Sequence, residues 1–119
     1  LQKEILSSRV VGKMGLVGSL AKMSMGAFGA SVDISSRIEE FGDIGSAMYS
    51  EPLYEIIIEV AQACDFSSMV AELGLFLDFE NLGNVIEGDL LIGNDLSVST
   101  SDLTKNYLSG WEKQFETLA

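Results

Sequence analysis

The chain has no histidine, and its 119 residues include one cysteine, one proline and one tryptophan. Without histidine there is no imidazole to serve as a general base, to activate a serine or cysteine nucleophile, or to bind zinc, iron or copper. The lone Cys64 cannot form an intramolecular disulfide, and its neighbours Ile57, Val60 and Ala61 indicate a buried thiol that packs as a small hydrophobe. We therefore expect no enzyme activity, no metal and no cofactor.

Positive charge is also scarce. Seven Lys and Arg stand against eighteen Asp and Glu, which gives a formal net charge of −11. A chain of this charge repels polyphosphate and shows no basic patch, so nucleic acid is not expected as a partner. Residues 1–32 are mildly basic, whereas the acidic residues lie mainly between Asp33 and Asp102. This asymmetry favours contact between the basic N-terminal part of one subunit and the acidic body of another.

Long hydrophobic runs are missing as well, because no run reaches the roughly 18 to 20 residues of a membrane-spanning helix. The nearest is Met14 to Val32, which Lys22 and several glycines interrupt. Membrane contact through this stretch is a minor alternative that requires Lys22 to snorkel. The chain begins at Leu1 with no secretory signal near it, so we expect a processed chain or a fragment of a longer protein.

Hydrophobic residues make up 47% of the chain and recur mainly at helical spacing, three and four residues apart. Such spacing runs through residues 1–13, 14–30, 34–48, 51–64, 66–82 and 103–118. Before the last of these, Leu90 to Ile92 and Leu96 to Val98 flank Gly93-Asn94, which predicts a β-hairpin, and Ser99 to Asp102 has the form of a capping box. We expect a mainly α fold: one compact helical domain of five or six helices over residues 1–119, with a small β-hairpin before the C-terminal helix.

One segment also fits a strand. Tyr54 to Val60 contains three isoleucines and a valine, which favour sheets, and its alternate residues would share a face. Helical spacing instead places Glu55 and Glu59 on a solvated polar stripe opposite the apolar side chains. The helix is our first interpretation, and an α+β fold with residues 53–60 as a strand is the alternative.

Small residues gather on one side of the helix predicted up to residue 30. At about 100° per residue, they fall within one narrow wedge. The members are Gly12, Gly15, Ser19, Gly26 and Ala30. Small side chains let another helix approach closely, and each interior glycine costs nearly 1 kcal/mol relative to alanine, so tight packing has to compensate. We expect that packing within the domain or at an interface with another subunit.

The predicted C-terminal helix carries its large apolar side chains on one face, including the only tryptophan. Docking onto the rest of the domain is the simplest explanation. Terminal helices rich in aromatic residues also bind partners. Trp111 and Phe115 are therefore further candidates for an interface.

Asp78 to Asp95 is the one oxygen-rich stretch. Aligned with the calcium loop of an EF-hand, Asp78 takes position 1, Gly83 position 6 and Asp89 position 12, but Leu82 falls at position 5, where an oxygen ligand is needed. We expect a solvated acidic loop and assign no metal site to it.

Together these features predict a non-catalytic structural or adaptor subunit of a larger protein assembly. It would act through helix-mediated contacts with a second copy or with a heterologous subunit. One alternative is a small-molecule binding module with an apolar pocket. The other is a membrane-active helical protein that inserts Met14 to Val32.

Overall fold

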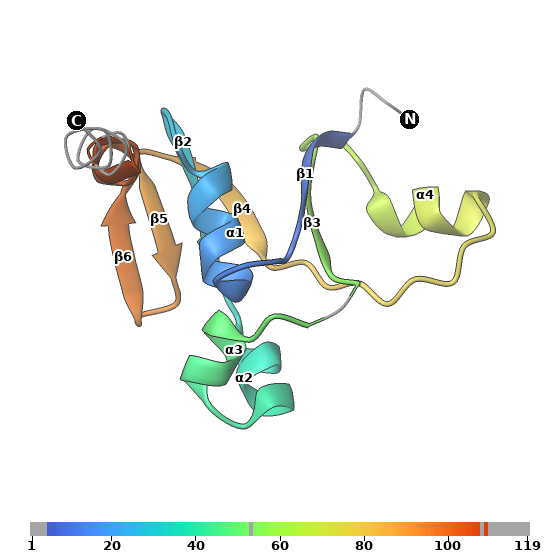
Figure 1. Cartoon of the computed structure of the whole chain (residues 1–119). Helices are drawn as coiled ribbons and strands as arrows, with labels where there is room; N and C mark the ends of the chain where they lie inside the picture. Colours follow the sequence, from blue (N-terminus) through green and yellow to red (C-terminus); the bar gives the residue numbers. More distant parts are fainter. Residues whose placement is uncertain (1–4, 53, 108, 110–119) are drawn as a thin grey trace, which may run out of the picture.

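The computed structural model describes residues 5–52, 54–107 and 109, which form an α+β fold with six strands in two sheets (Figure 1). In chain order the elements are β1 (Ile5–Val10), α1 (Gly15–Met23), β2 (Phe28–Val32), α2 (Ser35–Phe41), α3 (Ile44–Tyr49), β3 (Ile56–Val60), α4 (Phe66–Glu72), β4 (Gly83–Glu87), β5 (Asp89–Ile92) and β6 (Leu96–Ser99). A further helix begins at residue 100 and is described through residue 107. The prediction of a mainly α, helical domain is therefore wrong. The alternative, with a strand within residues 53–60, agrees with β3.

The larger sheet forms the body of the protein. Its strand order is β4-β2-β5-β6, with β2 antiparallel to β4 and parallel to β5. β5 and β6 form the predicted antiparallel hairpin. Leu90 and Ile92 alternate along β5, so they share one face, and both are completely buried. They belong to one apolar cluster with Leu16 and Leu20 of α1, which places the core between this helix and the sheet.

Two of the predicted helices are strands. Residues 5–10 form β1 and residues 56–60 form β3, and these two strands pair antiparallel with each other, Val10 opposite Ile56. Short apolar runs fit a helix and a strand about equally well, and periodicity alone does not separate them. Each strand pairs with a segment far away in the sequence, and the hydrophobic spacing within one segment contains no information about that partner.

Other predicted helices are shorter than their apolar spacing indicates. α1 ends before Gly26, whose φ of +125° turns the chain into β2, so residues 14–30 do not form one helix. Gly42, with φ +92°, separates α2 from α3, where the spacing predicts a single helix. Side chains disfavour such left-handed backbone, so these turns need glycine. α4 likewise ends at residue 72, well short of residue 82.

Polar side chains cap two helices through hydrogen bonds within their local sequence, and the capping box predicted at Ser99 is one of them. The Asp65 carboxylate accepts a hydrogen bond from the backbone N–H of Ser68 at 3.2 Å, at the start of α4. The Ser99 hydroxyl accepts one from the backbone N–H of Asp102 at 3.1 Å, where the C-terminal helix begins. Both bonds join residues three apart, so neither depends on the tertiary fold.

Asp43 also caps a helix. Its carboxylate accepts the backbone N–H of Ser46 at 2.7 Å at the start of α3. That bond, followed by one from the Ser46 hydroxyl, holds the pKa of Asp43 below its ordinary value of 3.8. At Asp65 the Ser68 hydroxyl is the larger cause and the Ser68 N–H the second, and they also lower the pKa.

β1 and β3 form a two-stranded ribbon outside the main sheet. The ribbon, α4 and the segment 73–82 lie to one side of the body in Figure 1, and we call them the arm. The protein measures 55 × 35 × 26 Å, and its radius of gyration is 16.0 Å. A compact domain of this length would have about 13.5 Å. The chain therefore leaves more of its surface open than most domains of its size.

Candidate interaction surface

Large apolar side chains gather at the surface of the arm. Nine of them are exposed: Ile5, Leu6, Val10 and Ile56 on the ribbon, and Leu73, Leu75, Phe76, Leu77 and Phe79 after α4. We call these nine residues the apolar arm surface. Single exposed hydrophobic residues are ordinary on soluble proteins, but a concentration of them indicates a surface that another molecule covers.

The register of the ribbon explains why its apolar side chains are exposed. Successive side chains in a strand point to opposite faces. Arg9 lies opposite Ile57, and Ile57 packs against the core, so this face points toward the body. The other face carries Val10 opposite Ile56, each 62% exposed, and no charged side chain opposes them. The ribbon thus turns an apolar, uncharged face away from the core.

The segment after α4 is held at its ends but not along its length. Gly74 follows the helix, and the backbone N–H of Leu75 donates to the carbonyl of Val70 at 3.2 Å. The Phe79 ring meets the Phe66 ring of α4 edge to face, with 4.8 Å between their centroids. Phe76, between these anchors, is fully exposed. Within the described part of the chain, no backbone hydrogen bond joins residues 76–81 to a strand.

The total exposed surface supports the same interpretation. The chain exposes 8548 Å², whereas a folded monomer of 12.8 kDa ordinarily exposes about 6,300 Å². The difference is about 2,200 Å². The exposed fractions of the nine apolar residues account for about 900 Å² of surface, taking roughly 180 Å² for each such residue when fully exposed.

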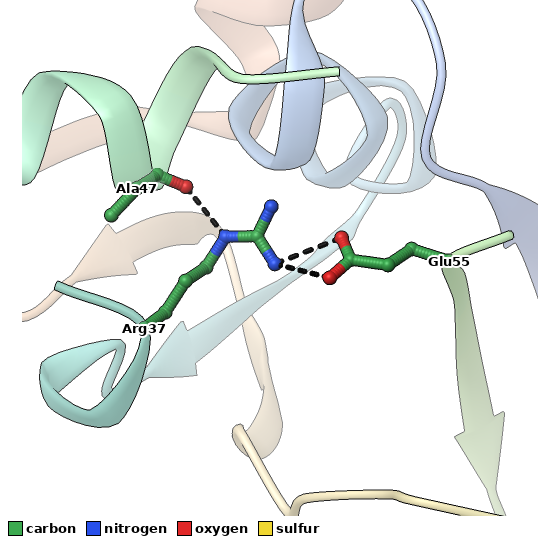
Figure 2. A network of polar contacts seen from close by, with 3 residues as sticks. All are labelled: Arg37, Ala47 and Glu55. Carbon is green, nitrogen blue, oxygen red and sulfur yellow. Dashed lines mark hydrogen bonds and ion pairs between the residues drawn. The ribbon is translucent and has the colours of Figure 1, made fainter. Parts of the chain in front are cut away.

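An ion pair fastens the ribbon to the body (Figure 2). Arg37 of α2 donates from Nη1 to both carboxylate oxygens of Glu55, at 2.8 Å each, and from Nε to the carbonyl of Ala47 in α3 at 2.6 Å. The guanidinium also lies over the Phe41 ring, 4.7 Å from its centroid. The carbonyl of Glu55 accepts the backbone N–H of Val11 at 2.9 Å. One residue beside β3 therefore contacts both the helix pair and the end of β1.

The geometry of this pair is not ideal. One guanidinium nitrogen serves both oxygens, and the buried Nη2 of Arg37 makes no hydrogen bond in the described structure. An Arg fork that used both terminal nitrogens would satisfy it. Glu55 was expected on a solvated helical stripe with Glu59, and this expectation is wrong. Glu55 pairs with Arg37, and Glu59 accepts the Ser7 hydroxyl across the ribbon at 2.9 Å.

In the structure, the small residues predicted to lie on one side of a helix belong to different elements. Gly12 precedes α1, Gly26 follows it in a turn, and Ala30 lies in β2. Only Gly15 and Ser19 belong to α1, and both are buried. A Cβ on Gly15 would lie 2.6 Å from the carbonyl oxygen of Ser50, so its small size serves packing inside the chain.

The two larger interface candidates, Trp111 and Phe115, lie outside the described residues. The apolar arm surface was missed because its segments have the spacing of core helices. Hydrophobic spacing marks a residue as one that leaves water, but it does not say whether the covering atoms belong to the same chain.

No family model, curated protein or solved structure matches this chain. Its function therefore has to be inferred from its own residues. Across residues 5–52, 54–107 and 109, no group of three His, Cys, Asp or Glu side chains is placed to hold a metal ion. None of the helices described there has the length and apolar character needed to cross a membrane. The stretch Asp78 to Asp95 is divided between β4, β5 and their connections instead of forming one acidic loop.

Proposed function

We propose that this chain is a non-catalytic structural or adaptor subunit of a protein assembly, and that it binds its partner through the apolar arm surface. The observation that carries the proposal is the set of nine large apolar side chains exposed on the arm, which together offer about 900 Å². A standard interface covers about 800 Å² on each partner. The nine apolar residues alone offer an area of that size.

The two alternatives from the sequence have less support. The membrane-active alternative requires one long helix over Met14 to Val32, but this stretch forms α1, a turn and β2. A binding pocket for a small molecule would draw apolar side chains into a concavity. Here Phe76, one of the large apolar side chains, is fully exposed.

The proposal is tested on the native protein in an extract of the cells that make it, by gel filtration with detection of this chain. We expect the chain to elute well above its own mass of 12.8 kDa. Phe76→Ser with Leu77→Ser should return it to the monomer position, because both side chains belong to the apolar arm surface and are exposed.

Tyr107→Ser is the matched control, since Tyr107 is a half-exposed aromatic residue on the C-terminal helix, outside the arm. Elution as a monomer before any substitution refutes the proposed function. The chain is also tested for sedimentation with phospholipid vesicles. If it sediments and the Phe76 and Leu77 substitutions abolish this, the apolar arm surface binds lipid and the protein-assembly proposal fails.

A further inference from the structure

The two outer edges of the ribbon have no strand partner among the described residues. β1 and β3 pair with each other and with no other described strand. Isolated two-stranded ribbons are marginal in water, and an unpaired edge offers a row of backbone donors and acceptors to a further strand. β3 has the sequence Ile-Ile-Ile-Glu-Val, and neither ribbon strand contains the proline that blocks such pairing.

The segment 75–79 has the complementary properties. Its sequence, Leu-Phe-Leu-Asp-Phe, is apolar apart from one carboxylate, and it belongs to no helix or strand. All five residues are exposed. Residues 76–79 make no backbone hydrogen bond to any described residue, so their amides and carbonyls are available for strand pairing. One chain therefore carries both an unpaired strand edge and an unpaired apolar segment.

Charge distinguishes the two edges of the ribbon. The donor segment carries Asp78 and is followed by Glu80. β3 carries Glu59 and follows Glu55, so like charges oppose pairing there. β1 carries Arg9, which is exposed, and Lys13 follows it. Complementary charge thus favours the edge of β1.

Resting on the proposed function, we propose that the partner is a second copy of this chain, whose segment 75–79 adds as a strand to the free edge of β1. An antiparallel register that sets Asp78 opposite Arg9 also sets Leu77 opposite Val10. The first pair matches in charge. The second continues the apolar row of Val10 and Ile56 on the outer face of the ribbon. Two copies satisfy both contacts reciprocally, so a dimer is the smallest closed assembly.

The test uses the purified chain alone, by size-exclusion chromatography with light scattering over a wide concentration range. We expect a dimer of twice 12.8 kDa that dissociates on dilution. Arg9→Glu and Asp78→Lys should each raise the dimer dissociation constant at least about tenfold, because each places two like charges opposite each other. Salt at about 1 M should reduce this difference. Lys22→Glu and Asp95→Lys, at exposed positions in α1 and in the hairpin turn, are matched charge controls that should leave dimerisation unchanged.

Mixing the two variants makes the experiment specific for contact between copies. In a mixed dimer, the carboxylate introduced at position 9 of one copy would face the ammonium group introduced at position 78 of the other, and the second contact would keep its native Arg9 and Asp78. We therefore expect the equimolar mixture of Arg9→Glu and Asp78→Lys to recover the wild-type dissociation constant to within about threefold, which neither variant reaches alone. In wild type, the alternate amides of segment 75–79 that face β1 should exchange with deuterated solvent at least about tenfold more slowly on dimerisation, because strand pairing protects them.

A monomer at every concentration overturns the inference that the partner is a second copy. It leaves the proposed function standing if the native extract still contains a larger assembly. A dimer that the charge variants do not weaken, or that the mixture does not restore, overturns the strand-pairing geometry. Circular dichroism of each variant shows whether it is folded before its association is interpreted.

Discussion

Replacing Glu55 should destabilise the protein more than replacing Arg37, although the two side chains form one ion pair. The side chain of Arg37 is 10% exposed and that of Glu55 is 35% exposed. Glu55→Gln therefore leaves a buried guanidinium without a counter-ion. Arg37→Met leaves a carboxylate that water reaches, and it removes the unpaired Nη2 as well. The free-energy cost of an unpaired charge falls with its access to water.

The magnitudes follow from the bonds that each change removes. A hydrogen bond to a charged group contributes about 1.5–3 kcal/mol, and Glu55→Gln removes the charge from two of them. We expect a loss of about 3 kcal/mol, below the upper range for buried pairs because Glu55 is partly hydrated. Arg37→Met also loses the bond to Ala47, but it keeps an apolar stem over Phe41, and we expect a loss of about 1.5 kcal/mol.

The assay is urea unfolding followed by far-ultraviolet circular dichroism, for wild type, both single variants and the double variant. The double variant should lose about as much as Arg37→Met alone, because the neutral amide introduced at position 55 then has no buried charge beside it. The coupling free energy should be about 3 kcal/mol. Equal losses in the two single variants, or additive losses in the double variant, refute the reasoning from burial.

Four further changes test the fold. Ile92→Ala should lower the free energy of unfolding by about 3 kcal/mol, measured by urea unfolding, because the side chain is completely buried. Gly15→Ala should cost at least about 2 kcal/mol in the same assay, since φ is +64° and the new Cβ would meet backbone atoms at 2.6 Å. Tyr54→Gly should raise the unfolding temperature or leave it unchanged, because Tyr54 has a φ of +64° and its side chain contributes almost no burial. Asp43 and Asp65 have lowered pKa values in the folded state, so the stability they contribute is present above about pH 4 and is lost as the pH falls through those lowered values. Between about pH 6 and about pH 2 the unfolding temperature of the Asp43→Asn, Asp65→Asn variant should therefore fall less than that of wild type.

What the sequence predicts correctly is local. The cap at Ser99 and the β5–β6 hairpin each depend on residues a few positions apart. β1 and β3 pair across a long stretch of chain, and no pattern within either segment records that pairing. Cys64, expected to be buried on a helix, is only partly buried and lies in the connection between β3 and α4.

Arg37 is a residue that its position in the sequence marks as unusual. On a helical wheel it falls between Phe41 and Ile44, within the apolar stripe that these two form with Ile34 and Ile38. A cation in such a stripe needs a counter-ion or a route to water. Its partner, Glu55, lies in a segment assigned to another helix, so the sequence indicates the need for a carboxylate without identifying which one.

The charge of the chain and its apolar arm surface make opposite demands on solubility. Nine exposed apolar residues favour indiscriminate association, whereas a net charge of −11 makes copies of the chain repel one another at most orientations. At contact distance, the charges nearest the contact determine whether two copies attract or repel each other. In β1 and β3, Arg9 is the one positively charged residue, and it lies next to the apolar face. Association is then favoured only where an apolar strand with a carboxylate meets β1. In the proposed dimer, the acidic excess thereby restricts the apolar arm surface to one orientation of one kind of partner.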